Sequence, residues 1–156
     1  MKDMKIYRLS DKPEFVEKVA AVYLQEWQWH FKKEWNISDM KEMKDDILEN
    51  YMSITFVALS TTNEFMGTVA LLESDTEKPN EYIPWLSCLY VDEKYQLDDA
   101  LRLHLVNFIK SLVDRCLYLW CYTEDDRKFY EKCGFFIVDD MPYFQSRAYV
   151  MLWNKR

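Results

Sequence analysis

The order in which strand-like and helix-like segments follow one another constrains this chain more than any other feature of its sequence. Segments typical of strands lie at residues 6–9, 54–60, 65–72, 85–91, 117–120, 135–138 and 147–153. Apolar residues at helical spacing predict helices at 16–27, 40–51, 101–112 and 125–133. A strand–helix–strand crossover therefore stands beside an antiparallel meander. This order predicts an α/β (α+β) fold with a mixed, mostly antiparallel sheet of about seven strands and helices on both faces.

The length and composition predict one well-packed domain over residues 1–156. Hydrophobic residues make up 49% of the chain and aromatic residues 17%, which excludes a disordered protein. No repeat, low-complexity tract or linker divides the sequence, and no apolar run reaches the roughly 18 residues that a membrane span needs. Residues 1–6 carry mixed charges, unlike a signal peptide. We expect an intracellular, cytoplasmic protein with no membrane partner.

Charge and metal-ligand spacing exclude two classes of function. The formal net charge is −7, whereas phosphate-binding surfaces for nucleic acid are basic. The same acidity is compatible with an amine-bearing substrate, or it only keeps the domain in solution. The cysteines form no CxxC pair and the histidines no HxxxH, so we expect reduced core thiols and no metal. The cysteines are Cys88, Cys116, Cys121 and Cys133, and the histidines are His30 and His104.

Several segments, taken in order, resemble one known family. They are residues 56–59, 66–71, 83–95, 117–120 and 129–135. In sequence and order they are similar to the second to fifth strands, and the helix that follows the fifth, of the GNAT superfamily of acyl-CoA-dependent N-acetyltransferases. The resemblance covers nearly the whole chain. It implies that the fourth and fifth strands, 85–91 and 116–121, run parallel and diverge at their C-terminal ends.

The resemblance also implies a binding slot for acetyl-CoA between these two strands. In GNAT proteins, unpaired backbone groups of the fourth strand bond the pantetheine arm, which places that role on Leu89, Tyr90 and Val91. The plainer interpretation is that Leu89 and Val91 are core residues of a strand, and the two interpretations are compatible. One face of a strand can pack while its backbone binds a ligand.

The loop after the fourth strand departs from the family pattern. GNAT proteins carry Arg or Gln, two residues, Gly, one residue, then Gly or Ala, and the backbone N–H groups hold the CoA pyrophosphate. The corresponding residues here are Gln96, Leu97, Asp98, Asp99, Ala100 and Leu101. Gln96 fits, but Asp99 and Leu101 replace the small residues. We expect their side chains to occupy the phosphate position, and Asp98 or Asp99 to cap the helix and oppose the phosphates.

Three further residues take catalytic or binding roles by the same resemblance. Tyr130 matches the tyrosine that donates a proton to the leaving thiolate in the family. The alternative interpretation is that Tyr130 is only a half-buried aromatic residue on a short helix. Glu73 is the best-placed base, with a solvated loop charge as its alternative. Thr123 replaces an Asn that commonly follows the fifth strand, and it keeps a hydroxyl group. The aromatic residues between Trp27 and Trp35 either wall an amine site or cover the sheet edge, and His104 is expected to be packed.

The sequence thus supports two classes of function. The first is an N-acetyltransferase that moves an acetyl group from acetyl-CoA to a primary amine of a small molecule or peptide in a ternary complex. The alternative is a non-catalytic GNAT-fold protein that acts as a binding or regulatory module. In either case we expect a monomer or a homodimer.

Overall fold

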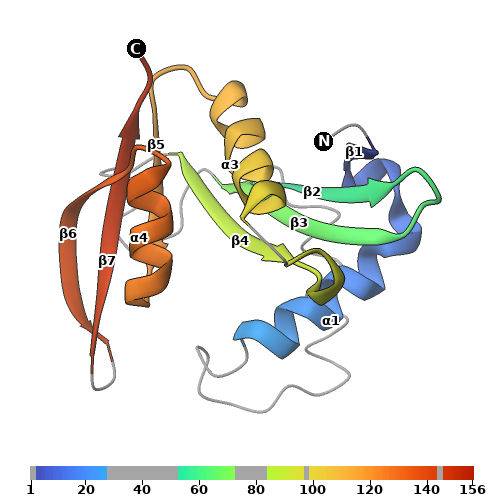
Figure 1. Cartoon of the computed structure of the whole chain (residues 1–156), viewed down its shortest axis with the longest axis horizontal. Coiled ribbons are helices and arrows are strands. Elements are labelled where there is room, and N and C mark those ends of the chain that lie inside the picture. The colour runs from blue at the N-terminus through green and yellow to red at the C-terminus, as the bar shows by residue number, and fades with distance from the viewer. Residues whose placement is uncertain (1–2, 28–52, 73–83, 97–98, 144–145) are drawn as a thin grey trace.

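A seven-stranded sheet forms the centre of the computed structural model, which describes residues 3–27, 53–72, 84–96, 99–143 and 146–156 (Figure 1). The strand order is β1-β2-β3-β4-β5-β7-β6, and all neighbouring pairs are antiparallel except β4 and β5. The strands are β1 Met4–Arg8, β2 Ser53–Ser60, β3 Phe65–Leu72, β4 Trp85–Val91, β5 Cys116–Cys121, β6 Phe136–Tyr143 and β7 Ser146–Asn154. The predicted mixed, mostly antiparallel sheet is confirmed.

Helices cover the sheet from both sides, as predicted. The described α-helices are α1 Val16–Trp27, α3 Ala100–Leu112 and α4 Glu124–Lys132. Short 3-10 turns lie at Leu9–Asp11, Pro13–Phe15 and Glu93–Tyr95. The predicted helix at 40–51 lies outside the described residues.

Alternation along β2 sends its side chains to two separate cores. Phe56 and Ala58 belong to the larger cluster, which includes buried residues of α3 and α4. Val57 and Leu59 belong to a smaller cluster with Val19 of α1. Because successive side chains of a strand point to opposite faces, α1 lies on one face of the sheet, and α3 and α4 lie on the other.

The last hairpin differs most from the sequence expectation. β6 continues to Tyr143, whereas the pattern predicted a strand that ends at residue 138. Asp139 and Asp140 interrupt the apolar run, and Pro142 lacks an N–H group for a sheet ladder. All three are tolerated because β6 is the last strand of the sheet order, and a bulge falls between Ile137 and Asp139.

The two parallel strands β4 and β5 form a ladder only where β4 begins. Their register consists of one pair, Trp85 with Tyr118, next to a hydrogen bond from the Tyr118 N–H to the Pro84 carbonyl (2.9 Å). Beyond that point the strands separate as the two arms of a V (Figure 1). The predicted divergence is therefore present, and β5 supplies no ladder partner to the rest of β4.

Gly67 on β3 gives a test of how tightly β4 is held. A Cβ atom at this position would lie 2.6 Å from the Tyr90 carbonyl oxygen and 3.4 Å from a methyl group of Leu105. The first contact is with backbone, which cannot rotate away. We therefore predict that Gly67→Ala lowers the free energy of unfolding by about 1–3 kcal/mol. Chemical denaturation measures this, and an unchanged stability would contradict the close approach of β3 and β4.

Candidate active site

The strand β4 carries a bulge beyond the point where it separates from β5. Ala70 of β3 pairs with Ser87 and Thr68 pairs with Tyr90, so that two residues of β4, Cys88 and Leu89, stand opposite one residue of β3. Cys88 has a φ of 52°. A left-handed conformation costs a non-glycine residue roughly 1–2 kcal/mol. Bulges re-aim backbone groups and are common beside active sites.

Tyr23 of α1 supports this bulge from the opposite face of the sheet. Its hydroxyl group takes part in side-chain hydrogen bonds with Thr55, Cys88 and Thr68. Thr68 in turn donates to the Phe56 carbonyl (2.8 Å), which leaves its hydroxyl oxygen able to accept. Burial, and then the neighbouring Cys88, raise the pKa of Tyr23 well above its ordinary value. Sequence reasoning placed Tyr23 only in a helical repeat, because nothing nearby in the sequence marks its partners.

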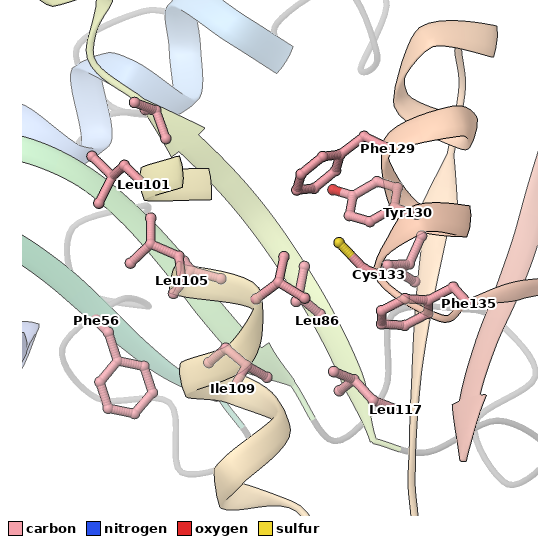
Figure 2. Close-up of a cluster of buried hydrophobic side chains, with 14 of the residues drawn as sticks. Phe56, Leu86, Leu101, Leu105, Ile109, Leu117, Phe129, Tyr130, Cys133 and Phe135 are labelled. Atoms are coloured by element: carbon pink, nitrogen blue, oxygen red, sulfur yellow. The ribbon is translucent and has the colours of Figure 1, made fainter. Parts of the chain in front are cut away.

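Tyr130 lies on α4, the helix that follows β5. Thr123 positions its helix, because the Thr123 hydroxyl caps α4 by accepting from the Asp126 N–H (3.1 Å). The Tyr130 ring packs edge-on against Phe129 and Phe135, at centroid distances of 5.2 and 5.9 Å. Figure 2 shows its hydroxyl group pointing away from α4, toward the side on which β4 lies.

The environment of Tyr130 keeps the phenol protonated. Burial first, and the nearby Asp126 second, raise the Tyr130 pKa far above the ordinary value for tyrosine. No hydrogen bond within the described part of the chain engages its hydroxyl group. A neutral O–H group with a free donor is what a proton donor needs before reaction.

The structure corrects the expectation for the loop that precedes α3. Leu101 is 1% exposed and belongs to the main core cluster, and Asp99 pairs with Arg102 at 3.3 Å (Figure 2 shows Leu101 in the cluster). The expectation that the Leu101 side chain occupies the phosphate position is therefore wrong, whereas that for Asp99 stays a prediction. Asp99 stands at the N-cap position but forms no side-chain cap bond, so its predicted capping role is also wrong. Leu97 and Asp98 lie outside the described residues.

Gln96, the residue that fits the family pattern, folds back onto the end of β4. Its side-chain amide donates to the Val91 carbonyl. One backbone acceptor expected for pantetheine is therefore engaged by the chain itself. Asp92 caps the 3-10 turn between them, because its carboxylate accepts from the Lys94 N–H (3.3 Å). This turn brings the chain from β4 to the start of α3.

Acidic residues surround the C-terminal end of β4 on the α1 side. Burial raises the pKa of Tyr90, and Asp92, Glu26 and Glu93 raise it further. The Tyr90 ring also stacks on Phe65, with centroids 6.4 Å apart. This combination of negative charge and aromatic surface suits a cationic molecule.

The predicted site residues thus fall into two groups on either side of the separated strands, and a third group lies outside the described residues. Leu89, Tyr90, Val91, Gln96, Asp99, Ala100 and Leu101 come from β4 and the start of α3, and Thr123 and Tyr130 come from the start of α4 and its interior. Glu73, proposed as the base, lies outside the described residues, as do residues 28–35 of the aromatic segment. Within the described ranges, no three His, Cys, Asp or Glu residues come together as a metal site. Among the helices whose placement is described, none is long and apolar enough to cross a membrane.

Comparisons with known proteins find matches among solved structures alone. No protein-family model and no curated protein sequence matches this chain. Spermidine N-acetyltransferase from Vibrio cholerae, in a dodecameric structure, matches with a TM-score of 0.72 and 15% identity, over 99% of this chain and 95% of that one. The same enzyme in complex with CoA and spermine matches with a TM-score of 0.66 and 13% identity, over 99% of this chain and 96% of that one. A GNAT-family acetyltransferase from Staphylococcus aureus matches with a TM-score of 0.67 and 16% identity, over 97% of this chain and 98% of that one.

These similarities define a class of fold. The chain has the GNAT acetyltransferase fold over essentially its full length, which confirms the fold that the sequence motifs predicted. At 13–16% identity the similarity shows the fold, while activity and substrate depend on the residues of the site.

A pair of leucines on α3 tests the corrected orientation of the loop. Leu101 is 1% exposed and Leu103 is 41% exposed. We predict that Leu101→Ala lowers the free energy of unfolding by about 2–5 kcal/mol, because it leaves a cavity in the main core. The matched control Leu103→Ala should change it by less than about 1 kcal/mol. Equal effects in thermal or chemical denaturation would mean that Leu101 does not point into the core.

Proposed function

We propose that this protein is an N-acetyltransferase that transfers the acetyl group of acetyl-CoA to a primary amine of a small cationic molecule. The observation that carries the proposal is the separation of β4 from β5 beyond one register pair, with the Tyr130 hydroxyl group pointing from α4 toward the side on which β4 lies. A strand edge without a ladder partner can bond the amides of an extended ligand as a neighbouring strand would. The pantetheine arm of CoA has such amides.

The residues on each side of the opening suit different parts of the reaction. Acetyl-CoA supplies the acetyl group as a thioester. Leu89 offers backbone groups on the β4 edge, beside the bulge at Cys88, and the first turn of α3 offers N–H groups to phosphate. Tyr130 holds a proton on its hydroxyl group and gives it to the sulfur as the carbon–sulfur bond breaks.

The amine must lose a proton before its nitrogen can form the new bond to the acetyl carbon. A primary amine has a pKa near that of lysine, about 10.4, so it enters the site as a cation. Glu26, Asp92 and Glu93 provide the negative potential that attracts it. Glu73 stays our proposal for the base that removes the proton.

A polyamine is the acceptor class that we test first. The structural neighbours include a spermidine N-acetyltransferase that was solved with CoA and spermine. Several positive charges on one small molecule also match the acidic end of β4 and the net charge of −7. A peptide amine is the other acceptor within the proposal, and the oligomeric state stays a prediction of monomer or homodimer.

The non-catalytic alternative has one specific observation in its favour. Both small residues of the phosphate loop are replaced, and Asp99 is held by Arg102 beside the start of α3. A chain with a fixed anion at that position can keep the fold and lose the activity. Incubation with acetyl-CoA and spermidine, spermine or a lysine peptide, followed by mass spectrometry, separates the two. Binding of acetyl-CoA without a product 42 Da heavier from any amine would favour the alternative.

Tyr130→Phe tests the catalytic role directly. Because the hydroxyl group acts only as the sulfur leaves, we predict that kcat falls by about 10²–10⁴-fold while the Kd for acetyl-CoA changes little. Tyr7→Phe, on the edge strand β1 at the far side of the sheet, is the matched control and should leave both unchanged. Steady-state kinetics and calorimetry measure the two constants. An unchanged kcat in Tyr130→Phe would assign Tyr130 to the core alone.

The pH dependence gives an independent check on the same residue. Burial raises the Tyr130 pKa, and a group with a raised pKa keeps its proton until the pH exceeds that pKa. Tyr130 should therefore contribute no fall in kcat between about pH 7 and pH 10, where an ordinary phenol begins to ionise. Wild type and Tyr130→Phe should show pH profiles of the same shape. A descending limb in this range that Tyr130→Phe abolishes would contradict the assigned environment.

A further inference from the structure

Arg102 joins the beginnings of the two helices that stand on either side of the opening. Its Nη2 atom lies 3.3 Å from Asp99 Oδ1, at the N-cap of α3, and its Nη1 atom lies 3.1 Å from Asp126 Oδ1, in the first turn of α4. The guanidinium carbon lies 3.7 Å from the centroid of the Phe129 ring. The side chain is 28% exposed, so solvent and solutes can reach it.

The hydrogen bonds of Arg102 are incomplete in this arrangement. A guanidinium group has five N–H donors in a fixed planar fork. The Arg102 Nε atom is buried and has no partner, and it is the only such side-chain atom within the described residues. A buried unpaired donor is unfavourable. The present arrangement therefore does not use the full binding capacity of the group.

Arg102 lies in the first turn of α3, next to the loop that, by the resemblance to GNAT proteins, would hold the CoA pyrophosphate. The start of α3 follows the end of β4, and the Asp99 side chain does not cap its N–H groups. The glycines that let backbone amides approach a pyrophosphate are absent from residues 96–101. A planar guanidinium fork binds phosphate oxygens in pairs, which makes it the natural replacement for backbone donors.

We infer that Arg102 is the phosphate-binding residue of the CoA slot in this chain, an inference that rests on the proposed function. In the free protein Asp99 and Asp126 hold the guanidinium between α3 and α4. When CoA binds, its pyrophosphate replaces at least one of these carboxylates on the fork. The loop then binds the diphosphate through a side chain, which accounts for the loss of both small residues without loss of the slot.

The test compares ligands with and without phosphate by calorimetry. CoA and 3′-dephospho-CoA both carry the pyrophosphate, and pantetheine carries neither phosphate group. We predict that Arg102→Gln weakens binding of CoA and of dephospho-CoA by about tenfold or more, since hydrogen bonds to charged groups contribute at this level. Binding of pantetheine should not change, and Arg102→Lys should fall between, because it keeps the charge and loses the fork.

Arg127→Gln is the matched control for charge. Arg127 also pairs with two carboxylates, Glu124 and Glu131, and its side chain is 31% exposed, but it stays within α4. Its replacement should leave all three affinities within about twofold, because a surface ion pair contributes little. If Arg127→Gln weakens CoA as much as Arg102→Gln does, the effect is one of general charge and the inference is wrong.

A second variant keeps the inference testable if Arg102→Gln does not fold. Asp99→Asn removes a carboxylate that competes for the guanidinium, so CoA should bind several-fold tighter. Asp125→Asn makes the same change of charge in the first turn of α4 and should have the smaller effect. Equal effects of the two variants, or none, would overturn the inference.

The outcomes also separate this inference from the proposed function. If wild type binds neither CoA nor pantetheine and acetylates no amine, the proposed function fails and the inference fails with it. If wild type binds CoA and acetylates an amine, but Arg102→Gln weakens CoA and pantetheine equally or weakens neither, only the inference fails. Arg102 is then a structural link between α3 and α4.

Discussion

The separation of β4 from β5 is the constraint on which the remaining structure depends. A parallel pair that makes one register contact leaves most of β4 without a ladder partner on that side. Buried main-chain groups without partners are costly, so such an edge is retained where water or a ligand can satisfy it. The wedge at the closed end is filled by side chains from both arms, among them Leu86 of β4 and Leu117 of β5 (Figure 2). The core therefore packs against both strands next to the single pair that joins them.

The two helices that flank the opening are linked by charge as well as by packing. Arg102 and Phe129 connect the start of α3 to α4, and Lys110 donates to the Cys133 carbonyl near the other end of α4. Burial lowers the pKa of Lys110 below its ordinary value. Two basic side chains of α3 thus hold α4 at both of its ends. A ligand that enters between the helices must be compatible with these contacts or replace one of them.

Much of the fold could be predicted from the sequence because its signals are local. Strand and helix periodicity gave the element order, and the crossover between residues 91 and 116 required β4 and β5 to be parallel. The bulge at Cys88 could not be predicted, because no Gly or Asn marks the left-handed residue. The Tyr23 contacts were equally hidden, since their partners lie on strands far away in the sequence.

The loop before α3 shows where a resemblance misled the interpretation. Leu101 was already part of the apolar stripe with Leu105, so its burial could have been predicted from helical spacing alone. Asp99 and Arg102 are three residues apart, a spacing at which oppositely charged side chains meet on a helix. Comparison with the family pattern placed both Asp99 and Leu101 at the phosphate position instead. The pairing of Arg102 with Asp126, 24 residues away, had no signal in the sequence.

Hydrogen exchange of the backbone amides of β4, with and without acetyl-CoA, is the most direct test of the central claim that the separated edge of β4 is a ligand-binding edge. We expect acetyl-CoA to slow exchange at Leu89, where β5 supplies no ladder partner, and to leave the amides of β1 at the far edge of the sheet unchanged. Saturating acetyl-CoA with no change in β4, or with protection confined to another edge, would contradict the account.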